Sequence, residues 1–161
     1  MRSFHGQRRI VERGQSQVNL VIDASVLIKF YIPEILSDRA QYLLDSVRQG
    51  EITLLAPDLV YSEAGNILWK KHHLNELTRS EVEEISDAIV LLPLRVEPSK
   101  GLLPLAVHIG MAYGITVYDA MYVTLSRIHE IRMMTADRKL FERLAKTNLK
   151  KYMAWLGGAE W

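Results

Sequence analysis

Two aspartates follow short apolar runs that have the length of buried strands. Asp23 comes directly after Leu20–Ile22, and Asp137 comes after Ile131–Met134 with only two residues between. Because ligands of a parallel sheet bind beyond the carboxyl ends of its strands, we expect both carboxylates at one site. The alternative is that each aspartate caps the helix that follows it, where its side chain would accept a backbone hydrogen bond.

Glu63 is an acid in an apolar position. At helical spacing it shares a face with Val60, Ala64 and Ile67, so its carboxylate is expected to point inward. An inward carboxylate is costly unless a basic partner or a metal compensates it, and no lysine or arginine lies within one helical turn. Asn66 is on the same face and is expected to orient the carboxylate.

Asp119 completes the set of candidate acids. It lies in the expected first turn of a helix, where an acid also complements the positive end of the helix dipole, so a purely structural role is the alternative. Four acids directed to one edge of a sheet repel each other unless a cation is bound. The chain has no cysteine, and its five histidines, His129 among them, are interpreted as surface residues. We therefore expect Mg²⁺ or Mn²⁺, which favour oxygen ligands, to be bound by Asp23, Glu63, Asp119 and Asp137.

Short apolar runs alternate with amphipathic stretches along the chain, which is the pattern of a parallel α/β sheet. Ser37 is expected to cap the first amphipathic helix, and Asp58, after a proline, to cap the next and do nothing more. Thr78 and Glu81 form a capping-box pattern at the start of a third helix. The expected strands are 20–22, 52–55, 92–96 and 131–134, with a terminal edge strand at 151–155. The expected helices are 37–48, 58–71, 78–90, 101–113, 118–130 and 138–146.

Length and composition indicate one globular domain. The chain has 161 residues, of which 48% are hydrophobic and 24% charged, and its net charge of +1 neither requires nor excludes a polyanionic partner. Residues 1–17 are polar and lack apolar periodicity, so we interpret them as a tail outside a domain at residues 18–161. No apolar stretch approaches the roughly 20 residues needed to cross a bilayer, and no signal-peptide core follows the first residues, so a cytoplasmic location is expected.

Four motifs contain the candidate acids. In order they read V-I-D-A-S-V-L-I-K-F-Y-I-P-E, A-P-D-L-V-Y-S-E-A-G-N-I-L-W-K, T-V-Y-D-A-M-Y-V-T-L-S and T-A-D-R-K-L. From about Asn19 to Ala145 the sequence resembles the VapC branch of the PIN-domain family. It departs from that family in residues 1–17, which the family usually lacks, and in Gly65, which weakens a helix by up to about 1 kcal/mol. Neither departure affects the acids.

The resemblance implies a three-layer α/β/α sandwich around a central parallel sheet, with the four acids as the catalytic, metal-binding set. Ser25, Asn66 and Thr135 match polar residues that support those acids in the family. A helix cap and an exposed turn residue remain the alternatives for Ser25 and Thr135. The resemblance also implies Mg²⁺- or Mn²⁺-dependent cleavage of single-stranded RNA, a homodimer, and an antitoxin of the VapB kind that blocks the site.

The expected chemistry is in-line hydrolysis of a phosphodiester. The carboxylates would hold one or two ions that polarise the scissile phosphate and activate a water, giving 5′-phosphate and 3′-hydroxyl products. Lys29, Arg138 and Lys139 are candidate phosphate contacts. A phosphatase of the haloacid-dehalogenase type is disfavoured, because Ser25 stands where that class has a second aspartate. A PIN scaffold that binds RNA or a partner protein without cutting remains the alternative function.

Overall fold

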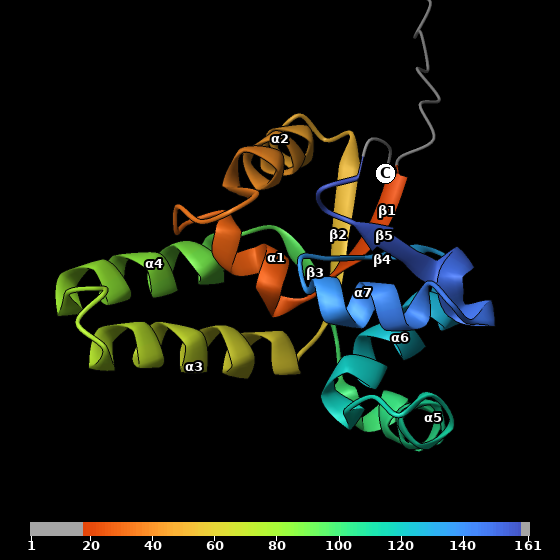
Figure 1. The fold of residues 1–161 in the computed structure, drawn as a ribbon. Helices are drawn as coiled ribbons and strands as arrows, with labels where there is room; N and C mark the ends of the chain where they lie inside the picture. The colour runs from red at the N-terminus through yellow and green to blue at the C-terminus, as the bar shows by residue number, and fades with distance from the viewer. Residues whose placement is uncertain (1–17, 159–161) are drawn as a thin grey trace, which may run out of the picture.

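Residues 18–158, which this computed structural model describes, are built around a sheet of five parallel strands (Figure 1). The strand order is β3-β2-β1-β4-β5, and every neighbouring pair is parallel. The predicted tail at residues 1–17 lies outside the described residues. The strands are β1 (Val18–Ile22), β2 (Ile52–Pro57), β3 (Leu94–Glu97), β4 (Arg132–Thr135) and β5 (Met153–Trp155).

Seven α-helices and one 3₁₀ helix in this part of the chain connect the strands. Because parallel strands are joined by right-handed crossovers, the connections from β1 to β2 and β3 run over one face of the sheet. The connections from β3 back to β4, and from β4 to β5, run over the other. Helices α1–α4 and α5–α7 therefore form two outer layers, which confirms the predicted three-layer sandwich (Figure 1). The helices are α1 (Ala24–Lys29), α2 (Ser37–Arg48), α3 (Leu59–His73), α4 (Arg79–Leu91), α5 (Ser99–Tyr113), α6 (Val117–His129), α7 (Arg138–Leu144) and the 3₁₀ helix η1 (Asn148–Tyr152).

The apolar runs that predicted the central strands are buried. Leu20, Val21 and Ile22 of β1 are no more than 2% exposed, and Met133 and Met134 of β4 are fully buried. A strand covered by helices on both faces has no solvent-facing side, so its sequence is a continuous apolar run rather than an alternating one. β1 and β4 pair side by side, and two of the candidate acids follow their carboxyl ends.

The strands predicted at 92–96 and 151–155 each begin two residues later than expected. The segment predicted at 92–96 forms β3 only from Leu94, because Leu92 still ends α4, with its N–H bonded to the Ile89 carbonyl. Pro93 then has no N–H to donate to a neighbouring strand. The predicted edge strand at 151–155 is also shorter, since η1 takes its first two residues and β5 begins at Met153. The pairing of this last strand with β4 places it at the edge of the sheet, as predicted.

Two predicted helix caps are wrong. Ser37 is the first residue inside α2, and its hydroxyl accepts a hydrogen bond from the Glu34 N–H at 2.7 Å instead of capping the helix. Asp58 makes no cap bond with α3. Its Oδ1 accepts hydrogen bonds from the backbone N–H and the hydroxyl of Ser99, 41 residues away at the start of α5. The predicted capping box at Thr78 is confirmed.

Helices α5 and α6 form a bent pair. Their axes differ by 113°, and Gly114 ends α5 in the left-handed conformation with φ of 63°. His129 in the last turn of α6 is not the free surface residue that was predicted, because its Nε2 lies 2.6 Å from Glu97 Oε1 at the end of β3. No single helix within residues 18–158 is long and apolar enough to cross a membrane, and α5 and α6 reach that character only as this bent pair.

Candidate active site

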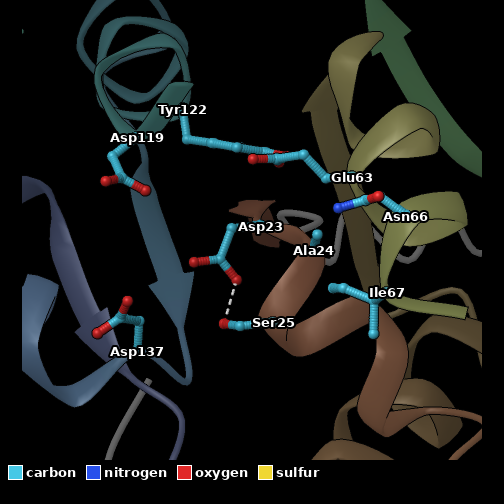
Figure 2. Close-up of a pocket in the computed structure, with 9 residues that line it drawn as sticks. All are labelled: Asp23, Ala24, Ser25, Glu63, Asn66, Ile67, Asp119, Tyr122 and Asp137. Carbon is cyan, nitrogen blue, oxygen red and sulfur yellow. Dashed lines mark hydrogen bonds between the residues drawn. The ribbon is translucent and has the colours of Figure 1, made fainter. Parts of the chain in front are cut away.

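The carboxyl ends of β1 and β4 open into a hollow lined by all four predicted acids (Figure 2). Asp23 lies between Asp119 and Asp137 on one side and Glu63 on the other. The four acids come from the end of β1, from α3, from the first turn of α6 and from the start of α7. The other lining residues are Ala24, Ser25, Asn66, Ile67 and Tyr122. The fold thus brings together acids that are separated by more than a hundred residues in the chain.

Asp23 is fixed by hydrogen bonds to both of its carboxylate oxygens. Oδ1 accepts from the Ser25 hydroxyl at 2.5 Å and from the Val26 N–H at 3.1 Å, so Asp23 also caps α1. Oδ2 accepts from the Thr135 hydroxyl at 2.5 Å. Burial raises the pKa of Asp23 to about 6 against the lowering effect of these three hydrogen bonds, and the charge of Asp119 adds to the rise. The side chain is therefore held firmly in a position that is unfavourable for its charge.

Ser25 and Thr135 link Asp23 to Asp137, which are the first and last of the four candidate acids in sequence order. Each hydroxyl donates to Asp23 and accepts a backbone N–H at 3.0 Å from one of the two residues that follow β4. Asp137 is the second of these residues, and its own Oδ1 caps α7 by accepting from the Leu140 N–H at 3.0 Å. One hydrogen-bonded network across two neighbouring strands thus sets the positions of both aspartates.

Glu63 is held by Tyr122. The phenolic hydroxyl of Tyr122 donates a short hydrogen bond to Glu63 Oε2, while the ring lies in the core at 1% exposure. Figure 2 shows the two side chains meeting end to end from α6 and α3. Burial raises the pKa of Glu63, the bond from Tyr122 lowers it, and the charge of Asp119 raises it again. Asn66, predicted to orient Glu63, lines the hollow but forms no hydrogen bond with it in the described part of the chain.

Asp119 is positioned by Thr116 at the start of α6. The Thr116 hydroxyl accepts from the Asp119 N–H at 3.1 Å, which caps the helix, and it donates to Asp119 Oδ2 at 2.7 Å. Burial raises the pKa of Asp119, the bond from Thr116 lowers it, and the charge of Asp137 raises it further. The carboxylate is therefore half-buried beside another negative charge.

The hollow gathers negative charge and supplies no positive charge of its own. Among the described residues that line it, none is lysine, arginine or histidine. Burial raises the pKa of three of the four acids, and a neighbouring carboxylate adds to each rise. A divalent cation would relieve this repulsion, and carboxylate and amide oxygens are ligands that Mg²⁺ and Mn²⁺ prefer. The donor set therefore fits a hard divalent ion.

The four carboxylates line the hollow without forming a finished coordination sphere. Between residues 18 and 158, no three acidic, histidine or cysteine side chains already stand close enough to enclose one ion. The acids lie on opposite walls, as Figure 2 shows, with Asp23 between them. The fit to a divalent ion thus depends on the chemistry of the donors and on the missing counter-charge.

The three predicted phosphate contacts differ in their surroundings. Lys29 is bonded to Glu34 at 2.9 Å, with its side chain 12% exposed, and it lines a separate hollow beside α2. Arg138 is paired through Nε with Glu142 at 2.7 Å. Lys139 is exposed, lines a groove next to the acids, and has no ion pair among the residues that the structure describes. Of the three, Lys139 is the one best placed to meet a substrate.

Two residues of the site were not predicted from the sequence. Tyr122 lies three residues after Asp119 among the core-facing side chains of a helix, and helical spacing gives that face but not the target of the hydroxyl. Thr116 carried a usable signal, because a threonine followed three residues later by an acid is typical of a helix start. The pair of Thr116 and Asp119 was therefore predictable, whereas the pair of Tyr122 and Glu63 was not.

Comparisons with known proteins agree with this geometry. The family model described as PIN domain matches residues 20–147. Ribonuclease VapC3 of Pyrobaculum aerophilum is 30% identical to this chain over 128 residues, which are 78% of this chain and 95% of that protein. The crystal structure of PAE2754, also from Pyrobaculum aerophilum, matches with a TM-score of 0.58 and 25% identity, over 86% of this chain and 84% of that one.

Proposed function

This chain belongs to the PIN-domain family, in its VapC-type branch, and on that premise we propose that it is a metal-dependent endoribonuclease that cleaves single-stranded RNA. The observation that carries the proposal is the hollow in which all four predicted acids converge with no cationic side chain among its described lining residues. The relative at 30% identity is named a ribonuclease, which supports RNA as the substrate. The phosphatase alternative is set aside, because the family match accounts for the same acids.

The four acids would hold the metal, and their neighbours would hold the acids. Bound Mg²⁺ or Mn²⁺ would polarise the scissile phosphate and make a water nucleophilic for in-line displacement, giving 5′-phosphate and 3′-hydroxyl ends. The hydroxyls of Ser25 and Thr135 keep Asp23 oriented, and Tyr122 does the same for Glu63. In this proposal the protein supplies fixed geometry and negative charge, so small displacements of the acids would be costly to the reaction.

We further propose that the protein is the toxin of a VapBC-type pair, that it forms a homodimer, and that it acts in the cytoplasm, where its RNA substrate would lie. The name of the relative supports the VapB-type antitoxin as a partner.

The test of the enzymatic function is cleavage of a mixed single-stranded RNA by the purified protein with Mn²⁺, beside an EDTA control. We expect cutting only with metal, and none by Asp119→Asn, which excludes a contaminating nuclease. Asp87→Asn, which changes an exposed carboxylate on α4, is the matched control and should cut like the wild type. If the wild type does not cut while Mn²⁺ still raises its melting temperature, the site binds metal and the substrate is different. If neither effect is seen, the alternative of a non-catalytic PIN scaffold is supported.

A further inference from the structure

A groove runs from the acids along α7. It shares Asp119 and Asp137 with the active-site hollow, so the two are continuous. Beyond these acids, its walls are the turn between α5 and α6 and the side chains along α7 and just after it. We call this surface the α7 groove; its further lining residues are Gly114, Ile115, Thr116, Lys139, Leu140, Glu142, Arg143 and Lys146.

Three cationic side chains lie along the α7 groove. Lys139, Arg143 and Lys146 are four and three residues apart, so they follow one side of α7 and of the turn after it. Lys139 and Lys146 are exposed, and neither has a hydrogen bond or ion pair within residues 18–158. Arg143 does have a partner, because its Nη1 donates a short hydrogen bond to the carbonyl of Gly114 at the end of α5. Arg143 therefore has a structural role, and the two lysines are available to a ligand.

The α7 groove carries unbalanced positive charge beyond the catalytic acids. Glu142 is the remaining acid among its described lining residues, and Arg138 pairs with it at 2.7 Å. Apart from Asp119 and Asp137 at the active-site end, the three cations are thus left without a counter-charge among the described lining residues. Ile115 and Leu140 also line the groove and add apolar surface to it. A ligand that suits this surface is a chain with repeated negative charges and apolar parts.

We propose that the α7 groove binds the sugar-phosphate backbone of the RNA strand beside the scissile phosphate, with Lys139 and Lys146 as phosphate contacts. The inference rests on the proposed ribonuclease function, because the strand passes from the groove into the hollow where the acids lie. Each nucleotide carries one phosphate charge, and a lysine that neutralises it releases a bound counterion. Contacts of this kind fix the path of the strand without reading its sequence.

The test compares two double variants that remove the same charge. Lys139→Gln with Lys146→Gln changes the groove, and Lys150→Gln with Lys151→Gln changes two exposed lysines that precede β5. Because β5 runs parallel to β4, the control lysines precede a strand at its amino end, whereas Asp137 follows its neighbour at the carboxyl end. An equal effect of both variants would report the net charge alone. The groove variant should melt at the wild-type temperature, because neither of its lysines has a partner in the described structure.

Binding and cleavage are measured separately. Binding of a short, fluorescein-labelled, mixed-sequence single-stranded RNA is followed by anisotropy in EDTA over a range of salt concentrations. Each phosphate contact contributes about 0.7 to the slope of log affinity against log salt, so the groove variant should have a slope shallower by about 1.4. Its KM for RNA cleavage in Mn²⁺ should rise as well. The control variant should keep the wild-type slope and KM.

The outcomes separate this inference from the proposed function. The groove inference is overturned and the ribonuclease proposal stands if the wild type cuts RNA and the groove variant keeps the wild-type salt slope and KM. The same holds if the groove and control variants change the salt slope and KM to the same extent. If the wild type binds RNA with a slope that falls only in the groove variant, but never cuts, the groove inference stands and the catalytic proposal fails. If the wild type neither binds nor cuts RNA, both are overturned, and an acidic protein segment becomes the better candidate for the groove.

Discussion

Replacing Asp23 by asparagine should stabilise the metal-free protein above about pH 6 while it abolishes cleavage. The residue is 7% exposed, and burial raises its pKa from 3.8 to about 6 despite three hydrogen bonds. Since each tenfold change in proton affinity is worth about 1.36 kcal/mol, the buried charge costs about 3 kcal/mol of stability. Asparagine removes this charge but turns an NH₂ group toward the Thr135 hydroxyl, at a cost of about 1 kcal/mol. The expected net gain in the free energy of unfolding is about 2 kcal/mol.

The gain should depend on pH in a definite direction. The folded state holds the proton of Asp23 more tightly than the unfolded state, so this carboxyl makes the free energy of unfolding fall as pH rises from about 4 to about 6. Below about pH 4 the wild type should be as stable as Asp23→Asn or slightly more so. At about pH 7.5 the variant should be the more stable protein. The raised pKa values of Glu63 and Asp119 also make the free energy of unfolding fall as pH rises, but they do so in both proteins. Their effects therefore largely cancel in the stability difference between wild type and Asp23→Asn.

The assay is urea unfolding in EDTA, followed by circular dichroism at about pH 4 and about pH 7.5, with Asp87→Asn as the control for an exposed carboxylate. Adding Mn²⁺ at the higher pH should raise the free energy of unfolding of the wild type more than that of Asp23→Asn, because an ion that binds only the folded state stabilises it. A stability difference between wild type and Asp23→Asn that is the same at both pH values would refute the reasoning. It would mean that Asp23 acts as a helix cap whose charge is not disfavoured by burial.

Three further substitutions separate the roles of other residues. Tyr122→Phe should raise the Mn²⁺ concentration needed for half-maximal cleavage, because Glu63 loses its hydrogen-bond donor, whereas Tyr113→Phe, which removes a hydroxyl contact outside the hollow, should not. Thr135→Val should lower the free energy of unfolding by about 1–3 kcal/mol in urea titrations, because it leaves a buried carboxylate oxygen and a backbone N–H without their partner. Asp58→Ala should lower it by no more than about 1 kcal/mol, since the carboxylate is exposed, and initial rates of RNA cleavage should stay at the wild-type level.

The arrangement of the sheet could be predicted because its central strands are buried on both faces. Leu20–Ile22 is an uninterrupted apolar run, and Ile131–Met134 is interrupted only by Arg132, which is exposed at the start of β4. Alternation of such runs with amphipathic segments is typical of parallel strands with crossover helices. The ends of the elements were less predictable. Leu92 is as apolar as a strand residue, and only its backbone bond to the Ile89 carbonyl assigns it to the end of α4.

The hydrogen-bond partners of the polar residues were harder to predict than their positions. The sequence places Asp58 before a helix, but the donor it bonds is Ser99, 41 residues away. Glu63 was expected to need a partner, yet the donor is Tyr122, 59 residues away on another helix. Helical and strand periodicity gives the face on which a side chain lies. It does not give the segment that packs against that face, which depends on the whole fold.

Helix capping and metal binding are not exclusive roles for an aspartate, because a carboxylate has two oxygens. Asp137 Oδ1 accepts a hydrogen bond from the N-terminus of α7, and Asp119 Oδ2 accepts one from Thr116 at the start of α6. In each carboxylate this bond fixes the orientation of the group and so also the direction of its second oxygen. Asp23 has donors on both oxygens, but each ionised oxygen can accept more than one partner. The bonds that begin the helices therefore also orient the acids at the ends of the strands. An aspartate between a buried parallel strand and a helix is thus a signal for both roles. What distinguishes Asp58 is that its bonds run to Ser99 at the start of α5, outside the hollow where the other acids meet.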